Sequence, residues 1–182
     1  MANIDVKQIK VAKRYAEALF ENSNVSNKLQ LVFDNLKLIE SVLNENSELK
    51  SFLENPVISH SDKKDVISEI FNEHVDESVK NLLFLLIDNN RFDLFFGVLI
   101  AYSNKLDETN NILKVKVISA VEVSEELKNA LVQKLENKVS KKVVPEYEIK
   151  PEIIAGLIIE VSDKTIDTSL KTKLNNLKKQ LI

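Results

Sequence analysis

The residues most able to act as general acids or bases near neutral pH are the chain's two histidines, His60 and His74. Each lies near the end of an expected helix among charged neighbours, and the sequence gives no reason for them to meet a nucleophile. The aspartates and glutamates are spread over polar helix faces, without the spacing of metal ligands. The chain has no cysteine, which excludes disulfides and thiolate chemistry. We therefore expect no catalytic site, no metal site and no cofactor.

Binding of nucleotides or nucleic acids is not expected either. The phosphate-cradling loop and the dinucleotide fingerprint both need several glycines at fixed spacing, and this chain has only Gly97 and Gly156. In the second half, lysines alternate with acidic residues and Tyr147 is the only aromatic residue that could stack on a base. We predict that the partners are proteins.

The composition is that of an ordinary globular protein. Of its 182 residues 44% are hydrophobic and 29% are charged, and the net charge of -3 creates no basic field. The longest apolar cluster, residues 82–87, is much shorter than the roughly 20 residues of a membrane-spanning helix. Residues 1–5 resemble neither a secretory signal nor a transit peptide. We expect the protein to act on the cytoplasmic side, with membrane contact only through partners.

The sequence pattern predicts an α+β fold in two domains. All eight phenylalanines precede residue 97, whereas the apolar positions after residue 110 are mainly Val, Ile and Leu. The first half repeats apolar residues at helical spacing, interrupted by a stop signal at Asn55-Pro56 and by start signals at Ser59 and Asp76. We predict that residues 1–107 form an all-helical bundle of about six helices.

The second half changes to a mixture of strands and helices. Leu113, Val115 and Val117 alternate with lysines, which predicts a strand, and Ser124 begins an expected helix. A further strand is expected near Tyr147. We predict that residues 111–182 form a small α+β domain.

The end of the chain contains the most specific pattern. An apolar strand over 155–161 is followed by an expected two-residue turn at Asp163-Lys164, a short return strand and a helix that begins after Ser169. We expect three isoleucines of these strands to lie in the domain core: Ile158, Ile159 and Ile166.

This order closely resembles the C-terminal signature of the δ subunit of bacterial F-type ATP synthases, the relative of the mitochondrial oligomycin-sensitivity-conferring protein. Two more blocks match the family in the same order, since residues 11–20 resemble its first helix and residues 81–92 resemble its fifth. The chain departs from the family at four places. The family usually has glycine at positions 155 and 162, arginine at 160 and Asp-Gly-Ser at 167–169.

The resemblance implies a non-catalytic stator subunit of a rotary ATP synthase. Such a subunit ties the catalytic head to the peripheral stalk, so that it resists torque during proton-driven ATP synthesis. The helical bundle is then expected to bind the N-terminal segments of the head's α subunits, and the second domain is expected to hold the stalk's b subunit. The expected location is the periphery of the cell membrane on its cytoplasmic side, and the residues do not fix whether the coupling ion is a proton or a sodium ion.

The first expected helix has two apolar stripes, although packing in one bundle needs only one. Val11, Tyr15 and Ala18 form the second stripe, and the fifth helix has apolar residues around more than a full turn. Central burial of both helices would explain this, and so would an apolar groove that receives an amphipathic helix. The resemblance favours the groove. The residues expected to contact the α subunits are Val11, Tyr15, Ala18, Leu82 and Leu85.

The terminal helix repeats leucines at steps of three and four residues, with lysines on its other faces. These leucines could pack on the domain's own sheet, or they could bind the stalk. The residues expected to contact the b subunit are Leu170, Leu174, Leu177 and Lys178. The alternative function is a free-standing cytoplasmic adaptor whose helical bundle binds amphipathic peptides, and an enzyme is a distant third.

Overall fold

The computed structural model describes residues 6–71, 74–139, 141–161 and 164–180. The chain divides into two compact units, Met1–Leu106 and Asp107–Ile182, which are described separately. The sequence analysis placed the domains at 1–107 and 111–182. The sixth helix crosses the division, so the joint lies within regular structure and not in a loop.

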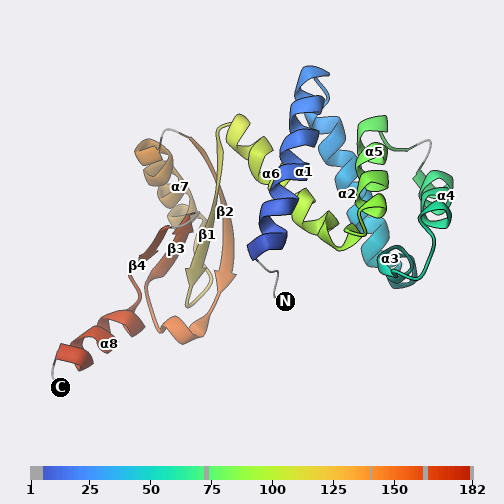
Figure 1. Cartoon of the computed structure of the whole chain (residues 1–182). Coiled ribbons are helices and arrows are strands. Elements are labelled where there is room, and N and C mark those ends of the chain that lie inside the picture. Colours follow the sequence, from blue (N-terminus) through green and yellow to red (C-terminus); the bar gives the residue numbers. More distant parts are fainter. Residues whose placement is uncertain (1–5, 72–73, 140, 162–163, 181–182) are drawn as a thin grey trace. The chain divides into compact units, whose positions relative to one another are not determined.

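Unit 1 is a bundle of α-helices (Figure 1). Its elements are α1 (Val6–Val25), α2 (Leu29–Glu45), α3 (Ser47–Glu54), α4 (His60–Phe71), α5 (Glu77–Asp88), the 3₁₀ turn η1 (Phe92–Leu94) and α6 (Phe95–Thr109). The predicted six-helix region is confirmed, and none of the described helices is long and apolar enough to cross a bilayer.

The helix starts follow the predicted capping residues. The Ser59 hydroxyl accepts a hydrogen bond from the Asp62 amide at 3.1 Å, just before α4. Asp76 caps α5 by accepting from the Ser78 amide at 3.0 Å, and its carboxylate also forms an ion pair with Lys28 at 2.6 Å. Because Lys28 donates a hydrogen bond to this carboxylate, the pKa of Asp76 lies below its ordinary value.

Asparagines end three of the helices, where other proteins often use glycine. Asn27, Asn90 and Asn111 have φ values of 53°, 51° and 54°. After α5 the Arg91 amide donates to the Leu86 carbonyl at 2.8 Å, and the Asn90 amide donates to Ile87 at 2.9 Å. This pair of bonds is typical of a helix whose capping residue is followed by a left-handed residue, here Asn90. Asparagine tolerates that conformation, which allows a chain with two glycines to make sharp helix ends.

The core of unit 1 is largely apolar and includes a buried, hydrogen-bonded tyrosine. Tyr102 is fully buried, and its hydroxyl lies 2.8 Å from the Ser23 hydroxyl and donates to the Leu29 carbonyl at 3.0 Å. Burial raises the pKa of Tyr102. These contacts hold the end of α1 and the start of α2 against α6. The exposed faces of α1 therefore have a fixed position in unit 1.

Unit 2 is a four-stranded mixed sheet with two α-helices among the described residues. Its elements are β1 (Ile112–Ser119), α7 (Glu125–Val139), β2 (Lys142–Ile149), the 3₁₀ turn η2 (Pro151–Ile153), β3 (Leu157–Val161), β4 (Lys164–Asp167) and α8 (Leu170–Gln180). The strand order is β2-β1-β3-β4, with β1 and β2 parallel and the other pairs antiparallel. The predicted α+β class is confirmed.

The core of unit 2 lies between one face of the sheet and α7. Val115, Val117 and Val143 of the sheet are buried there, and they pack against Leu131 and Leu135 of α7. The parallel pair β1 and β2 needs a crossover connection, and α7 provides it.

Two predictions about the terminal strands were wrong. Of the three isoleucines expected in the core only Ile159 lies there, because its neighbour Ile158 points to the other face of the strand and is half-buried outside the core. Ile166 is 44% exposed because β4 is the edge strand and α7 covers the side of the sheet near β2. Lys164 belongs to β4, where it pairs with Val161, and not to a turn. The other residue of the expected turn, Asp163, lies outside the described residues.

Candidate functional site

A cavity of about 390 Å³ opens between α1 and α5 in unit 1. Its lining residues are Val11, Arg14, Tyr15, Ala18, Leu85 and Arg91. Leu85 is 48% exposed although it belongs to the apolar run of α5, and Tyr15 is half-buried against the core with the rest of its ring at the surface. The structure therefore brings together four of the five residues predicted to bind the α subunits.

The fifth of these residues, Leu82, does not line the cavity. It is 6% exposed and lies in the core of unit 1. The six apolar residues of the run 82–87 divide by burial. Leu82, Leu83, Leu86 and Ile87 face the core, Phe84 is partly buried against it, and Leu85 faces out. One turn separates Leu82 from Leu86, which places both on the buried side of the helix.

Two arginines, the only arginines of the chain, both line this cavity. Arg14 comes from α1, and Arg91 follows α5, where the left-handed Asn90 turns the backbone. Neither guanidinium has an ion-pair partner among the described residues, and both side chains are exposed. Guanidinium groups bind carboxylates in a bidentate way and are enriched at protein interfaces. The cavity thus fits an amphipathic segment with apolar and acidic side chains.

The sequence analysis named neither Arg14 nor Arg91 as a site residue. The signal that could have found them was composition, because lysine supplies the chain's other basic charges and arginine occurs only at these two positions. That choice is informative, since lysine suits a solvated surface and arginine suits a planar, desolvated contact.

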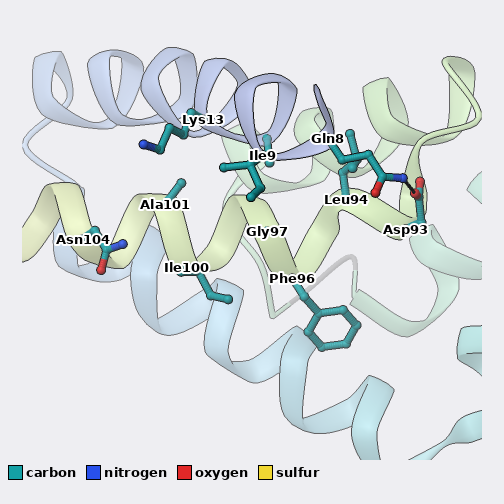
Figure 2. Close-up of a pocket in the computed structure, with 11 residues that line it drawn as sticks. Gln8, Ile9, Lys13, Asp93, Leu94, Phe96, Gly97, Ile100, Ala101 and Asn104 are labelled. Atoms are coloured by element: carbon teal, nitrogen blue, oxygen red, sulfur yellow. Dashed lines mark hydrogen bonds between the residues drawn. The ribbon is translucent and has the colours of Figure 1, made fainter. Parts of the chain in front are cut away.

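The opposite flank of α1 carries a second cavity of about 290 Å³, facing η1 and α6 (Figure 2). Gly97 allows the two helices to approach closely, since a Cβ at this position would lie 3.1 Å from that of Ala12. Ile9 and Ile100 are both exposed in its lining, and Gln8 donates a hydrogen bond to Asp93 at 3.2 Å. Ile9 is at helical spacing from the buried Ala12 and Ala16, but it lies at the surface.

In unit 2, α8 extends away from the sheet and touches mainly η2 (Figure 1). Leu170, Leu174 and Leu177 are 41%, 49% and 55% exposed, and the Lys178 side chain is also exposed. Of the two alternatives for the terminal helix, this exposure favours partner binding over packing of the leucines on the domain's own sheet. The side chain at position 181 lies outside the described residues.

The start of α8 is well fixed despite its exposed faces. The Asp167 carboxylate accepts hydrogen bonds from the Ser169 amide and the Thr172 hydroxyl, each at 2.7 Å. These bonds, those from Ser169 first, hold the pKa of Asp167 below its ordinary value. The Leu170 amide donates to the Ala155 carbonyl at 2.9 Å. The leucine face is therefore presented in a defined direction from the end of β4.

Of the two histidines, His60 makes a structural contact. A ring nitrogen of His60 lies 3.0 Å from the Asn90 side-chain oxygen, in the contact between α4 and the end of α5. His74 is exposed, and the described residues contain no group of three His, Asp or Glu side chains that could hold a metal ion. Exposed apolar helix faces such as those of α1, α5 and α8 are typical of surfaces that bind other proteins.

Comparison with known proteins gives the family. Residues 11–181 match the family model of the ATP synthase delta (OSCP) subunit. The chain is 36% identical over 173 residues to the ATP synthase subunit delta of Lachnoclostridium phytofermentans, covering 94% of both chains. It is 33% identical to the sodium-ion-specific ATP synthase subunit delta of Propionigenium modestum, covering 93% of this chain and 97% of that one.

A solved structure shares the fold over nearly the whole chain. A chain in the cryo-EM structure of the Toxoplasma gondii mitochondrial ATP synthase hexamer superimposes with a TM-score of 0.72 at 21% identity, covering 93% of this chain and 96% of that chain. At this level of identity the likeness concerns the fold.

The chain belongs to the ATP synthase delta (OSCP) subunit family. It is a non-catalytic stator component of an F-type ATP synthase, which takes part in ATP synthesis and ion transport and is associated with the membrane through the complex. Membership decides between the two predicted functions in favour of the stator over the free-standing adaptor.

Proposed function

We propose that the two units bind two different parts of the ATP synthase. In this proposal the α1–α5 cavity of unit 1 binds the N-terminal segments of the head's α subunits, and the leucine face of α8 binds the C-terminal end of the stalk's b subunit. The observation that supports it is the pair of exposed apolar helix surfaces, one in each unit, on a chain whose described residues form no candidate metal or acid–base centre. The protein would work at the cytoplasmic side of the cell membrane, held there by these partners.

The chemistry of the α1–α5 cavity specifies the helix that fits it. Val11, Tyr15 and Leu85 offer apolar surface, while the Arg14 and Arg91 guanidinium groups lie beside it. A helix with aliphatic residues at steps of three and four and with carboxylates on its flanks would satisfy both. Ala18 is small and exposed, so a helix backbone can approach α1 closely there.

Holding the head against rotation needs slow dissociation, which two separate contacts on one chain provide. When one unit is bound, the other is confined near its partner, and its effective concentration there is raised to the order of millimolar for short connections. The whole link then breaks only if both contacts open together. A stator subunit can thus resist torque continuously although each interface is modest in area.

The head contact is tested with a fluorescent peptide that carries the first ~20 residues of the cognate α subunit. Ala18→Asp is expected to weaken binding at least tenfold, because a carboxylate in the cavity repels acidic residues of the peptide and loses water on binding. Ile100→Asp is the matched control. Ile100 belongs to α6, is 57% exposed, and lines the cavity on the other flank of α1. Circular dichroism checks that both variants remain folded.

Unchanged affinity in a folded Ala18→Asp variant would remove α1 from the interface. Equal loss in both variants would assign binding to the α1–α6 side or to α1 as a whole.

The stalk contact is tested with the soluble part of the b subunit. Leu174→Asp is expected to abolish binding, because Leu174 is half-exposed in the centre of the leucine face. If Lys178 and the other α8 lysines contribute, stalk affinity also falls as ionic strength rises. Full stalk binding by Leu174→Asp would place the contact elsewhere on the protein.

A further inference from the structure

Unit 2 has another exposed apolar surface, where the loop after β1 meets the loop between η2 and β3. It surrounds a cavity of about 540 Å³. The large apolar residues that line it are Val121, Val123, Leu127, Ile154 and Leu157. Three of them are strongly exposed, with Val121 at 72%, Ile154 at 57% and Leu127 at 50%. We call this set of residues the γ-turn surface.

The backbone at Ile154 is strained. Its φ is 70° and its ψ is -57°, and the Ala155 amide donates to the Ile153 carbonyl at 2.9 Å across it. This is a γ-turn with positive φ, a rare conformation that is especially unfavourable for a β-branched residue. Because the side chain points largely into solvent, burial within the unit does not repay the strain. Strain of this kind often marks a binding site.

The strained loop cannot relax easily, because the residues after it are fixed. Gly156 has a φ of 90°, and a Cβ there would lie 2.5 Å from the Thr168 carbonyl oxygen, so the loop packs directly on the start of α8. The Leu170 amide also bonds to the Ala155 carbonyl. Ile154 is thus held rigidly in the exposed position, which reduces the entropy lost when a partner covers it.

The charge around the surface is acidic. Among the described residues that line the cavity, Glu122 is the sole charged one. Next to the cavity, α7 begins with Glu125 and Glu126, and only Glu125 forms a salt bridge there, with Lys128 at 2.5 Å. This polarity is opposite to that of α8 with its exposed lysines and to that of the α1–α5 cavity with its two arginines.

We propose that the γ-turn surface binds an amphipathic helix of a partner protein, with large aliphatic residues on one face and lysines or arginines beside them. Charge complementarity specifies this occupant, since the acidic rim would repel the carboxylate-bearing helix that fits the arginine-lined cavity. This contact is additional to the two in the proposed function. Unit 2 would then bind one partner segment at the lysine-bearing α8 and a second, basic segment at the acidic γ-turn surface.

The full-length protein is titrated into a fluorescein-labelled 18-residue peptide that has leucines on one helical face and lysines on the other, with a glutamate-for-lysine peptide as a charge control. Ile154→Gly is expected to raise the Kd of the lysine peptide at least fivefold while the Tm stays equal or rises, because glycine accepts a positive φ. Leu127→Ser, a half-exposed position, is expected to give a similar loss. Val57→Ser, 89% exposed in unit 1, should leave the Kd unchanged.

The proposal is overturned if Leu127→Ser and Ile154→Gly both keep the parent's affinity, or if the glutamate peptide binds as tightly as the lysine peptide. If Ile154→Gly lowers the Tm, the Leu127→Ser result decides alone. Leu174→Asp on α8 should leave binding of the lysine peptide unchanged, so failure of the proposed stalk contact and failure of this contact are seen in different variants.

Discussion

Replacing Gly156 by alanine is expected to destabilise unit 2 by about 3–4 kcal/mol. The backbone conformation supplies the first part of this loss. At a φ of 90° an alanine is strained, which costs roughly 1–2 kcal/mol. Unlike a surface substitution, this change acts on the junction that fixes both the strained loop and the start of α8.

Steric overlap supplies the rest of the loss. The new Cβ would lie 2.5 Å from the Thr168 carbonyl oxygen, a backbone atom that can move only if the β4–α8 junction moves with it. That junction is held by the Thr168 amide and hydroxyl, which both donate to the Leu157 carbonyl, at 2.9 and 2.6 Å. Each bond contributes about 1 kcal/mol. A domain of this size has a total stability of roughly 4–11 kcal/mol, so the loss would remove between about a third and nearly all of it.

Hydrogen exchange read by mass spectrometry measures this effect in each unit separately. In Gly156→Ala the amides of β1 and β3 should exchange faster by about a hundredfold or more, while those of α5 keep the parent's rates. Ala155→Gly is the matched control, because Ala155 has no positive φ, and it should change stability by less than about 1 kcal/mol. Parent-like protection of β3 in Gly156→Ala would refute the reasoning about this junction.

Two further substitutions test the electrostatics of unit 1 by urea denaturation over a range of pH. Asp76→Ala should cost about 1–2 kcal/mol at pH 7, since it removes a helix cap and the partner of Lys28. The pKa of Asp76 is depressed in the folded protein, so its contribution is complete above its unfolded value of about 3.9, and the difference between parent and variant should vanish as pH falls through the lower folded pKa. Lys63→Met should stabilise by about 1 kcal/mol at pH 7, since Lys63 is 3% exposed with no charged partner among the described residues. Burial lowers the pKa of Lys63, so the folded state releases its proton first and the advantage of Lys63→Met should shrink as pH rises toward 10.5; a constant difference would contradict the assignment.

Local signals predicted the helical part of the fold well. Ser59 and Asp76 cap the helices that their spacing indicated, and α3 ends at Glu54, directly before Asn55-Pro56. Such signals depend on hydrogen bonds between residues a few positions apart, which a sequence shows directly. The alternation of apolar residues with lysines near the start of unit 2 likewise predicted a strand there, and with it the α+β character of the unit.

Features that depend on distant neighbours were predicted less well. The sequence analysis placed Ile166 in the core with Ile159, and the two residues are indeed paired in the β3–β4 register. The sequence could not show that β4 would be an edge strand beyond the reach of α7. Leu82 and Leu85 belong to one apolar run, and only the packed bundle shows which of them is buried. The strained turn at Ile154 has no sequence signature, since an isoleucine is not expected at positive φ.

The candidate site was predicted through its apolar members and not through its charges. Two apolar stripes on one helix indicated a surface on Val11, Tyr15 and Ala18, and these side chains do line one cavity with Leu85. Arg91 could not be linked to them, because its position depends on how the backbone turns after α5. The charged residues of this site could therefore be assigned to it only in the folded structure, whereas excess apolar surface on a helix can be recognised from spacing alone.

The central claim is that this chain links the catalytic head to the peripheral stalk through two separate surfaces. An affinity-tagged soluble stalk subunit is immobilised and incubated with the head, with or without this protein, and the retained subunits are quantified. The head should be retained only when this protein is present. With Ala18→Asp the stalk should retain this protein without the head, and with Leu174→Asp it should retain neither. Retention of the head in the absence of this protein, or undiminished retention with both substitutions combined, would contradict the account.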